Sequence, residues 1–220
     1  GVGGGVELQD FVIAFTQADQ RARVELLRRG GRQRGGGDRR DDPAVRHGGK
    51  TERAADRKTH QRDRLAFARG TRLVILGSFP GAASLQAQQY YGHPRNHFWP
   101  LLGAIWGVDL VALPYAQRLA AARQRGLGLW DVYASCLRQG SLDSAIRAAE
   151  LNDLGSLKRR APTLQQVAHN GSESARAMAQ IRAMGLLVQR LPSSSPANAT
   201  WSFERKLGVW RATFELAGIA

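Results

Sequence analysis

The chain has 220 residues, and 32 Lys and Arg against 18 Asp and Glu give it a formal net charge of +14. Its single cysteine, Cys136, excludes an intramolecular disulfide, a cysteine-rich zinc site and a four-cysteine iron–sulfur cluster built from this sequence. Because no stretch approaches about 18 uninterrupted apolar residues, and no basic start precedes an apolar core, we expect neither a membrane-spanning helix nor a secretory signal. A soluble protein of the cytoplasm is the resulting expectation, and we separately expect it to be a monomer.

Residues 1–70 differ in composition from the rest of the chain. All five Trp and all four Tyr lie beyond residue 70, and the stretch 28–66 is rich in Gly and Arg with almost no apolar periodicity. Such a stretch cannot bury enough surface to offset the entropy of ordering it. We therefore expect residues 1–70 to be a mostly disordered N-terminal extension, and residues 71–220 to be one globular domain.

The role of the extension has more than one interpretation. The chain begins with Gly rather than Met, which suggests a fragment or an upstream mis-reading of the frame. Residues 6–27 have a loosely helical apolar spacing but no assigned function. A spacer or mistranslated leader is favoured over a nonspecific DNA-binding tail.

Beyond residue 70, short apolar runs alternate with helical segments. In chain order the pattern predicts a strand at 73–76, helices at 98–106 and 116–124, a strand at 127–132, a short helix at 141–146, a strand at 164–168, a helix at 172–184, a strand at 186–191 and a helix at 202–217. This alternation predicts an α/β fold, a three-layer α/β/α sandwich with a central parallel four-stranded sheet.

Charge gives a weak indication of the partner. Residues 71–220 carry 16 Lys and Arg and 8 Asp and Glu, a net charge of +8. Such a domain suits a polyanion, because each neutralised phosphate releases counterions. Arg-rich proteins from GC-rich genomes are also basic without binding nucleic acid, so charge alone leaves both interpretations open.

Three polar loops follow predicted strands: GSFPG at 77–81, HNG at 169–171 and PSSSPAN at 192–198. Since the carboxyl ends of parallel strands meet at one edge of a sheet, these loops are expected to converge on one crevice. Small and glycine residues there let backbone groups approach a ligand closely. Their convergence supports a site better than any one loop does.

The first of these loops begins a longer motif, LGSFPGAASLQAQQYYGHPRNHFW, from Leu76 to Trp99. The GSFPG turn alone is typical of a strand-to-helix connection, and it is neither a Walker loop nor a dinucleotide-binding glycine fingerprint. The full string and its spacing resemble the first motif of the uracil-DNA glycosylase superfamily, and most closely its family 6 deoxyinosine (hypoxanthine) DNA glycosylases.

The resemblance covers residues 72–217 and implies a uracil-DNA glycosylase-like catalytic domain. It implies a monofunctional enzyme of base excision repair that extrudes a deaminated nucleotide from double-stranded DNA and hydrolyses its N-glycosidic bond. Hypoxanthine is the expected base, and a uracil or thymine mismatch glycosylase is the alternative. A DNA-binding module of the same fold that has lost its chemistry is a further alternative.

Many members of the superfamily place Asp or Asn where this chain has Phe79, so the resemblance assigns the catalytic role to Asn96. An amide can orient water but cannot deprotonate it, and an oxocarbenium-like transition state needs little base strength. Capping the helix that starts near His97 is the other interpretation of Asn96. Gly77, Ser78 and Phe79 are expected in the base pocket, where the Phe79 ring could stack on the base.

Further contacts are expected from the rest of the motif and from the other two loops. The resemblance places Asn170 in the base pocket, although Asn-Gly is also a common turn. Tyr91 is compatible with the pocket and with core packing alike. Residues 191–198 resemble the second motif of the superfamily, which enters the DNA. The residues expected to contact DNA are His93, Arg95, Pro192, Ser193, Ser194, Ser195 and Asn198.

No His–Cys or His–Glu spacing indicates a metal, so we expect neither a metal nor a cofactor. Asp131 and Asp143 are interpreted as structural or capping residues rather than general bases. The expected partner is double-stranded DNA that contains a deaminated base, and no membrane partner is expected.

Overall fold

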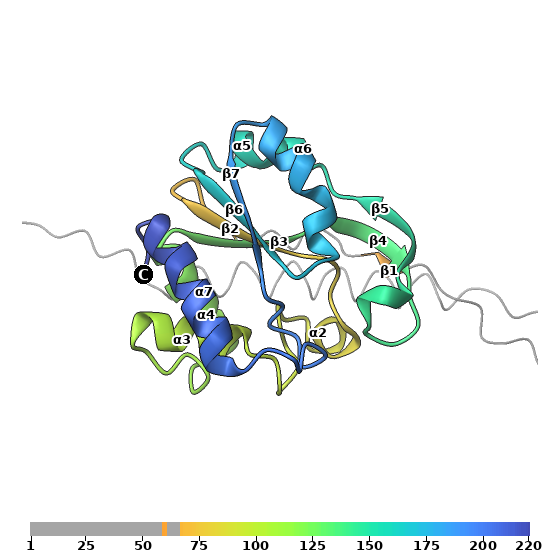
Figure 1. The fold of residues 1–220 in the computed structure, drawn as a ribbon, viewed down its shortest axis with the longest axis horizontal. Coiled ribbons are helices and arrows are strands. Elements are labelled where there is room, and N and C mark those ends of the chain that lie inside the picture. Colours follow the sequence, from red (N-terminus) through yellow and green to blue (C-terminus); the bar gives the residue numbers. More distant parts are fainter. Residues whose placement is uncertain (1–58, 61–66) are drawn as a thin grey trace, which may run out of the picture. The chain divides into compact units, whose positions relative to one another are not determined.

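The fold is built around a sheet of four parallel strands (Figure 1). The structure is a computed structural model that describes residues 59–60 and 67–220. In spatial order the strands are β3 (Leu127–Asp131), β2 (Leu73–Gly77), β6 (Gln166–Asn170) and β7 (Leu187–Leu191). Gly77 pairs with Asp131, and Asn170 pairs with Leu191. The carboxyl ends of all four strands therefore lie at one edge of the sheet.

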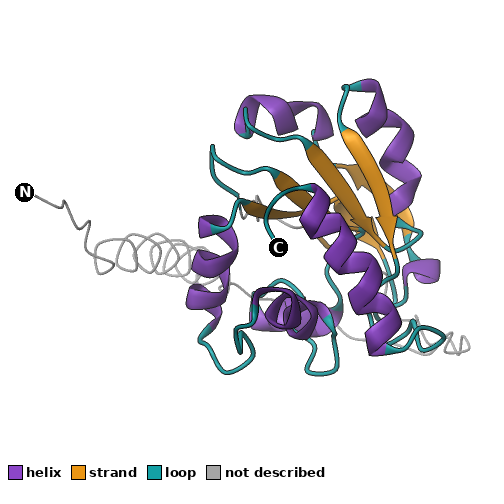
Figure 2. Cartoon of the chain, turned by 60° about the vertical axis from the view of Figure 1, so that its left-hand side comes forward, coloured by secondary structure: helices purple, strands orange, loops and turns teal. Residues whose placement is uncertain are grey.

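Helices cover both faces of this sheet, as the two views together show (Figures 1 and 2). One face carries α3 (Phe98–Trp106), α4 (Tyr115–Gln124) and α7 (Phe203–Leu216), and the other carries α5 (Leu157–Arg160) and α6 (Met178–Ala183). Alternate residues of β2 point to opposite faces of the sheet: Leu73 and Ile75 pack in one hydrophobic core, whereas Val74 and Leu76 pack in the other. The predicted three-layer α/β/α sandwich is confirmed.

A second, antiparallel sheet was not predicted from the sequence. It consists of β1 (Thr59–His60), β4 (Tyr133–Leu137) and β5 (Arg147–Leu151), in the order β1-β4-β5. Every residue of β5 is exposed, so the strand lacks the apolar alternation that would reveal it. β1 lies within the stretch for which we expected disorder.

Several elements differ from their predicted bounds. The predicted helix at 141–146 is wrong, because the structure has only a 3-10 turn, Asp143–Ala145, between β4 and β5. The third strand starts at Gln166 instead of residue 164, and the helix predicted at 172–184 is a 3-10 turn followed by α6. A short helix after β2, α2 (Ala82–Ala87), was not predicted.

The N-terminal extension expected over residues 1–70 lies mostly outside the described residues. Within residues 59–60 and 67–220, every helix is too short or too polar to cross a bilayer.

Candidate active site

The carboxyl ends of the four parallel strands border one cavity of about 580 Å³. Gly77, Asp131, Asn170 and Leu191, the last residues of the four strands, all line it. The loops that follow β2, β6 and β7 complete the wall. The volume falls within the ordinary range of ligand sites, roughly 300–1,000 Å³, so the cavity can receive a nucleobase.

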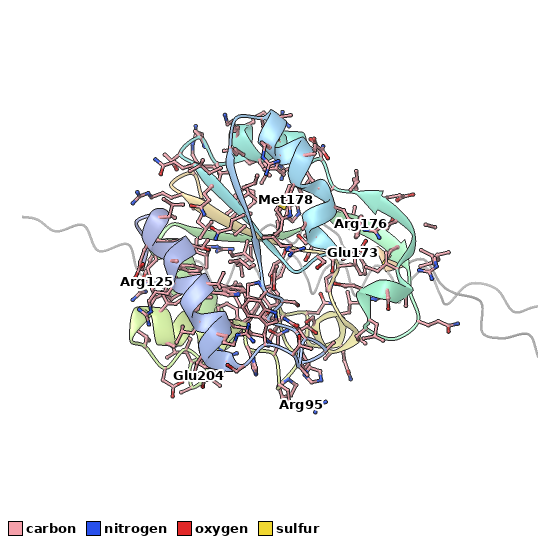
Figure 3. The ribbon with its side chains drawn as sticks, viewed as in Figure 1. Arg95, Arg125, Glu173, Arg176, Met178 and Glu204 are labelled. Carbon is pink, nitrogen blue, oxygen red and sulfur yellow. The ribbon has the colours of Figure 1, made fainter. Side chains whose placement is uncertain are left out.

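Nearly all the site residues expected from the sequence line this cavity. They are Gly77, Ser78, Phe79, Tyr91, His93, Asn96, Asn170, Pro192, Ser193, Ser194, Ser195 and Asn198. Arg95 does not line it; the side chain projects away from the ribbon at the edge of the molecule (Figure 3). The backbone N–H of Arg95 donates to Nδ1 of His93 at 3.1 Å, so Arg95 contacts a residue of the cavity wall.

The Asn96 amide has a fixed orientation. Its Oδ1 accepts a hydrogen bond from the Phe98 N–H at 2.9 Å, at the start of α3. The oxygen therefore caps the helix, while the amino group and the second lone pair of Oδ1 can serve a ligand. Capping and water orientation, the two interpretations of Asn96, are compatible in this geometry.

Tyr91 supplies an aromatic part of the wall. Its ring stacks on Phe98 with centroids 3.8 Å apart and planes inclined by 13°. Its φ of 54° lies in the left-handed region, which is unfavourable for a residue with a large side chain. Burial, and after it the Asp131 carboxylate, raises the pKa of the Tyr91 hydroxyl above its ordinary value, so the group stays protonated at neutral pH.

Gly77 leaves room for its neighbours at the strand end. A Cβ at this position would collide with Oδ1 of Asp131 and would contact the Tyr91 hydroxyl. Only glycine therefore allows these two side chains to approach the backbone of β2 so closely.

Ser78 and Asp143 form a hydrogen-bonded pair at the cavity. The Ser78 hydroxyl donates to Oδ1 of Asp143 at 2.7 Å, and Nη1 of Arg138 lies 3.9 Å from the same oxygen. Burial raises the pKa of the Asp143 carboxyl, while Ser78 and Arg138 oppose that rise. The pair joins the turn between β4 and β5 to the loop after β2.

Arg138 also holds the backbone of the GSFPG loop. Its guanidinium donates to the carbonyl oxygens of Phe79 and Pro80 and lies 5.4 Å from the centre of the Phe79 ring. Because Phe79 is only 6% exposed, little of its ring is left for stacking on a base. The structure therefore gives Phe79 a large packing role beside its place in the wall.

Asn170 binds the loop after β7 at two points. Its Oδ1 accepts from the Ser194 N–H and its Nδ2 donates to the Ser194 hydroxyl oxygen, each at 2.9 Å. Next to it, Gly171 has a φ of 99°, and a Cβ there would lie 3.1 Å from Cβ of Ser193. The Asn-Gly pair thus allows the loops after β6 and β7 to lie against each other.

Lys206 of α7 contacts both the loop after β7 and the residue before α3. This lysine is 1% exposed, and its Nζ donates to the Asn198 carbonyl at 3.0 Å and lies 3.5 Å from Nδ1 of His97. Burial lowers the pKa of Lys206, and burial together with Lys206 lowers the pKa of His97. The backbone N–H of His97 also donates to the Ser194 carbonyl at 3.0 Å. The loop after β7 is therefore connected to the start of α3 directly by this bond and indirectly through Lys206.

His169 lies beside Asn170 in sequence but on the opposite face of the sheet. Its Nδ1 is 3.0 Å from the Ser174 hydroxyl, which itself donates to the Leu76 carbonyl at 2.7 Å. Nδ1 must therefore carry a hydrogen, because the Ser174 hydroxyl hydrogen is already donated to Leu76. Burial lowers the pKa of His169 to about 4. The side chain fastens the segment after β6 and does not line the cavity.

Several residues of the cavity wall were not predicted from the sequence to have a functional role. Asp131, Asp143, Arg190 and Trp201 all line the cavity. Asp131 ends β3, so the rule used for the other strand ends would have included it. Asp143 carried no such signal, because its turn was predicted as a helix. Among the described residues, no group of three or more His, Cys, Asp and Glu could hold a metal ion.

Comparison with known proteins gives consistent results. The family model described as "Uracil DNA glycosylase superfamily" matches residues 66–214. The chain is 43% identical over 145 residues to a Methanosarcina barkeri protein named hypoxanthine DNA glycosylase, covering 66% of this chain and 91% of that protein. A Methanosarcina acetivorans protein of the same name is 40% identical over 144 residues, covering 66% and 90%.

A solved structure supports the same comparison. It is a solution NMR structure of a Methanosarcina acetivorans protein assigned to the uracil DNA glycosylases, with a TM-score of 0.64 and 37% sequence identity. The match covers 70% of this chain and 95% of that one.

Proposed function

Because the chain belongs to the uracil DNA glycosylase superfamily, we propose that it removes hypoxanthine from DNA by hydrolysing the bond between the base and C1′ of deoxyribose. The observation that carries the proposal is the cavity at the strand ends, which combines the fixed Asn96 amide with the loop at 192–198. The similarity to two proteins named hypoxanthine DNA glycosylase supports this choice of base.

The substrate is DNA, and the base must leave the helical stack to reach the cavity. Extrusion costs a few kcal/mol, roughly, and costs least at a mispair such as hypoxanthine opposite thymine. The loop at 192–198 offers serine hydroxyls and backbone groups, which are common partners of phosphate oxygens. The net charge of +8 on residues 71–220 favours the polyanion.

In the reaction, the bond between C1′ and N9 of the purine lengthens first, and its electron pair leaves with the base. Positive charge gathers on C1′ and the ring oxygen of the sugar. A water molecule then adds its oxygen to C1′ and releases a proton, and the departing base takes up a proton on nitrogen. The products are free hypoxanthine and an abasic site.

Asn96 is proposed to orient the attacking water. Its Oδ1 is held by the Phe98 N–H, so the amino group and the remaining lone pair have a defined direction before water arrives. Pre-orientation lowers the entropy cost of the attack. The amide does not deprotonate the water, which suits a transition state in which the carbon is already strongly electrophilic.

The experiment is excision from duplex oligonucleotides that contain one hypoxanthine, one uracil or no altered base, followed by alkaline cleavage of abasic sites. Strand scission at hypoxanthine is expected. Scission at uracil alone would favour the uracil or mismatch glycosylase. Binding without scission at either base would favour the DNA-binding module that has lost its chemistry.

We propose further that the enzyme acts as a monomer on double-stranded DNA in the cytoplasm, and that residues 71–220 form the catalytic domain. The match of the family model to residues 66–214 supports these bounds for the catalytic domain. Excision that depends on protein concentration more steeply than in first order would argue against a monomer.

A further inference from the structure

Deamination inverts the hydrogen-bonding pattern of a base. Adenine presents a lone pair at N1 and a donor amino group at C6, whereas hypoxanthine presents an N1–H donor and a carbonyl oxygen. Cytosine and uracil differ in the same way at N3 and C4. A protein acceptor aimed at this ring nitrogen therefore binds the deaminated base and repels its parent.

Two amide oxygens of the cavity wall, those of Asn170 and Asn96, are already engaged. Oδ1 of Asn170 accepts from the Ser194 N–H, and Oδ1 of Asn96 accepts from the Phe98 N–H. Each oxygen retains one lone pair, but each amino group also retains a hydrogen that can be donated to N1 of adenine, so an amide does not exclude adenine. A carboxylate accepts hydrogen bonds only, and it therefore discriminates more sharply.

Among residues 59–60 and 67–220, two carboxylates line the cavity, and they differ in access. Asp131 is 4% exposed and lies against Gly77, close to the Tyr91 hydroxyl. The side chain of Asp143 is 42% exposed and belongs to the turn between β4 and β5, which forms one side of the cavity. Asp143 is therefore the carboxylate that an entering base can reach.

The neighbours of Asp143 hold it in one orientation. The Ser78 hydroxyl and the Arg138 guanidinium both approach Oδ1, so among the described residues Oδ2 is available to a ligand. Arg138 is 5% exposed and is itself held by the carbonyls of the GSFPG loop. It partly neutralises the carboxylate, which lowers the cost of keeping an anion near DNA.

We propose that Asp143 determines base specificity by accepting a hydrogen bond from the N1–H of the extruded hypoxanthine. The inference rests on the proposed function, because it assigns the base-reading group of the same cavity. It extends to uracil, whose N3–H is the equivalent donor, and it excludes adenine and cytosine.

The test pairs a change in the base with a change in the protein. Single-turnover excision is measured on duplexes that contain hypoxanthine, N1-methylhypoxanthine or adenine, each opposite thymine, with the full chain and its Asp143→Ala and Asp143→Asn variants. In the unaltered enzyme, N1-methylation removes the donor and should slow excision by at least about tenfold, the usual effect of losing a hydrogen bond to a charged group.

If Asp143 accepts this hydrogen bond, the methylation penalty shrinks by about tenfold in Asp143→Ala, because its partner is gone. Any steric effect of the methyl group against other residues of the wall is present in both proteins and cancels in the comparison. In Asp143→Asn the preference for hypoxanthine over adenine falls by a similar factor, because the amino group can donate to N1 of adenine.

Asp153→Ala provides the matched control, since this carboxylate forms an exposed pair with Arg159 and does not line the cavity. It should leave all rates unchanged. The same methylation penalty in the unaltered enzyme and in Asp143→Ala would overturn the inference, and so would an unaltered base preference in folded Asp143→Asn. Failure of the unaltered enzyme to release hypoxanthine at all would instead overturn the proposed function.

Discussion

The side-chain amide of Asn170 is bound at both ends by one residue, Ser194. Oδ1 accepts from the Ser194 N–H, and Nδ2 donates to the Ser194 hydroxyl oxygen, each at 2.9 Å. Ser194 is fully buried, so water could not replace Asn170 as the acceptor for the Ser194 N–H. Asn170 therefore positions the loop at 192–198 in addition to bordering the cavity.

Asn170→Ala is expected to lower the free energy of unfolding by about 1–3 kcal/mol, because it leaves the buried Ser194 N–H without an acceptor. Excision should fall as well, since the loop loses its anchor. Urea unfolding and excision rates on a hypoxanthine duplex measure the two effects. Asn198→Ala is the control for stability: Asn198 donates to the Ser193 carbonyl but is only half-buried, so water can replace its amide more easily. Equal stabilities for both variants would contradict the assignment.

Asn96→Ala should reduce single-turnover excision by about a hundredfold or more if the amide orients water, the usual size of such positioning effects. It also removes the cap on the Phe98 N–H, at a cost of about 1 kcal/mol in unfolding free energy. Ser202→Ala separates the two effects, because Ser202 caps α7 through the Arg205 N–H at 3.3 Å and does not line the cavity. That variant should lose similar stability and keep its rate.

Lys206→Met replaces a buried ammonium group with an apolar side chain of similar length. Global stability should be unchanged or higher, because the variant no longer desolvates a charge. The Asn198 carbonyl loses its donor, so we expect KM for DNA to rise about fivefold while kcat changes little. A parallel fall in kcat and stability would show instead that Lys206 supports the whole domain.

His169 should make stability depend on pH between about 6.5 and 4. The unfolded chain binds a proton on this ring near 6.5, whereas burial lowers the pKa in the folded protein to about 4. Folding is therefore opposed by protonation: the stabilising contribution is complete above 6.5 and declines as the pH falls toward 4. The full difference is on the order of 3 kcal/mol.

The measurement is urea unfolding of the protein and of His169→Gln at intervals of pH. The carboxyl groups titrate in both proteins, so the difference between the two curves isolates His169. The variant should be less stable at pH 7.5 and should lose less stability on acidification. Parallel curves would contradict a buried, neutral imidazole.

The parallel sheet was predictable because its strands are apolar on both faces and end in recognisable turns. Leu73, Val74, Ile75 and Leu76 are all fully buried, and this continuous apolar run is typical of a parallel strand covered on both sides. The order of the strands in space, however, depends on packing between distant segments. It was not part of the sequence prediction.

The antiparallel sheet was not predictable for a physical reason. β5 is exposed along its whole length, so its sequence RAAEL carries neither apolar alternation nor enrichment in β-branched residues. The strand forms because β4 offers it a paired edge, and Ser135 donates to Glu150 at 2.6 Å across the pair. Missing this hairpin also hid Asp143, whose place at the cavity follows from the turn between the two strands.

The alternation of side chains along β6 limits where the sequence of this enzyme can gain or lose residues. Asn170 contacts the loop after β7 and His169 faces the other layer, only because the strand keeps its present register. Inserting or deleting one residue within 166–170 would exchange the two, sending an imidazole into the cavity and an amide into the apolar layer. Insertions and deletions among relatives should therefore be absent from the five residues of this strand.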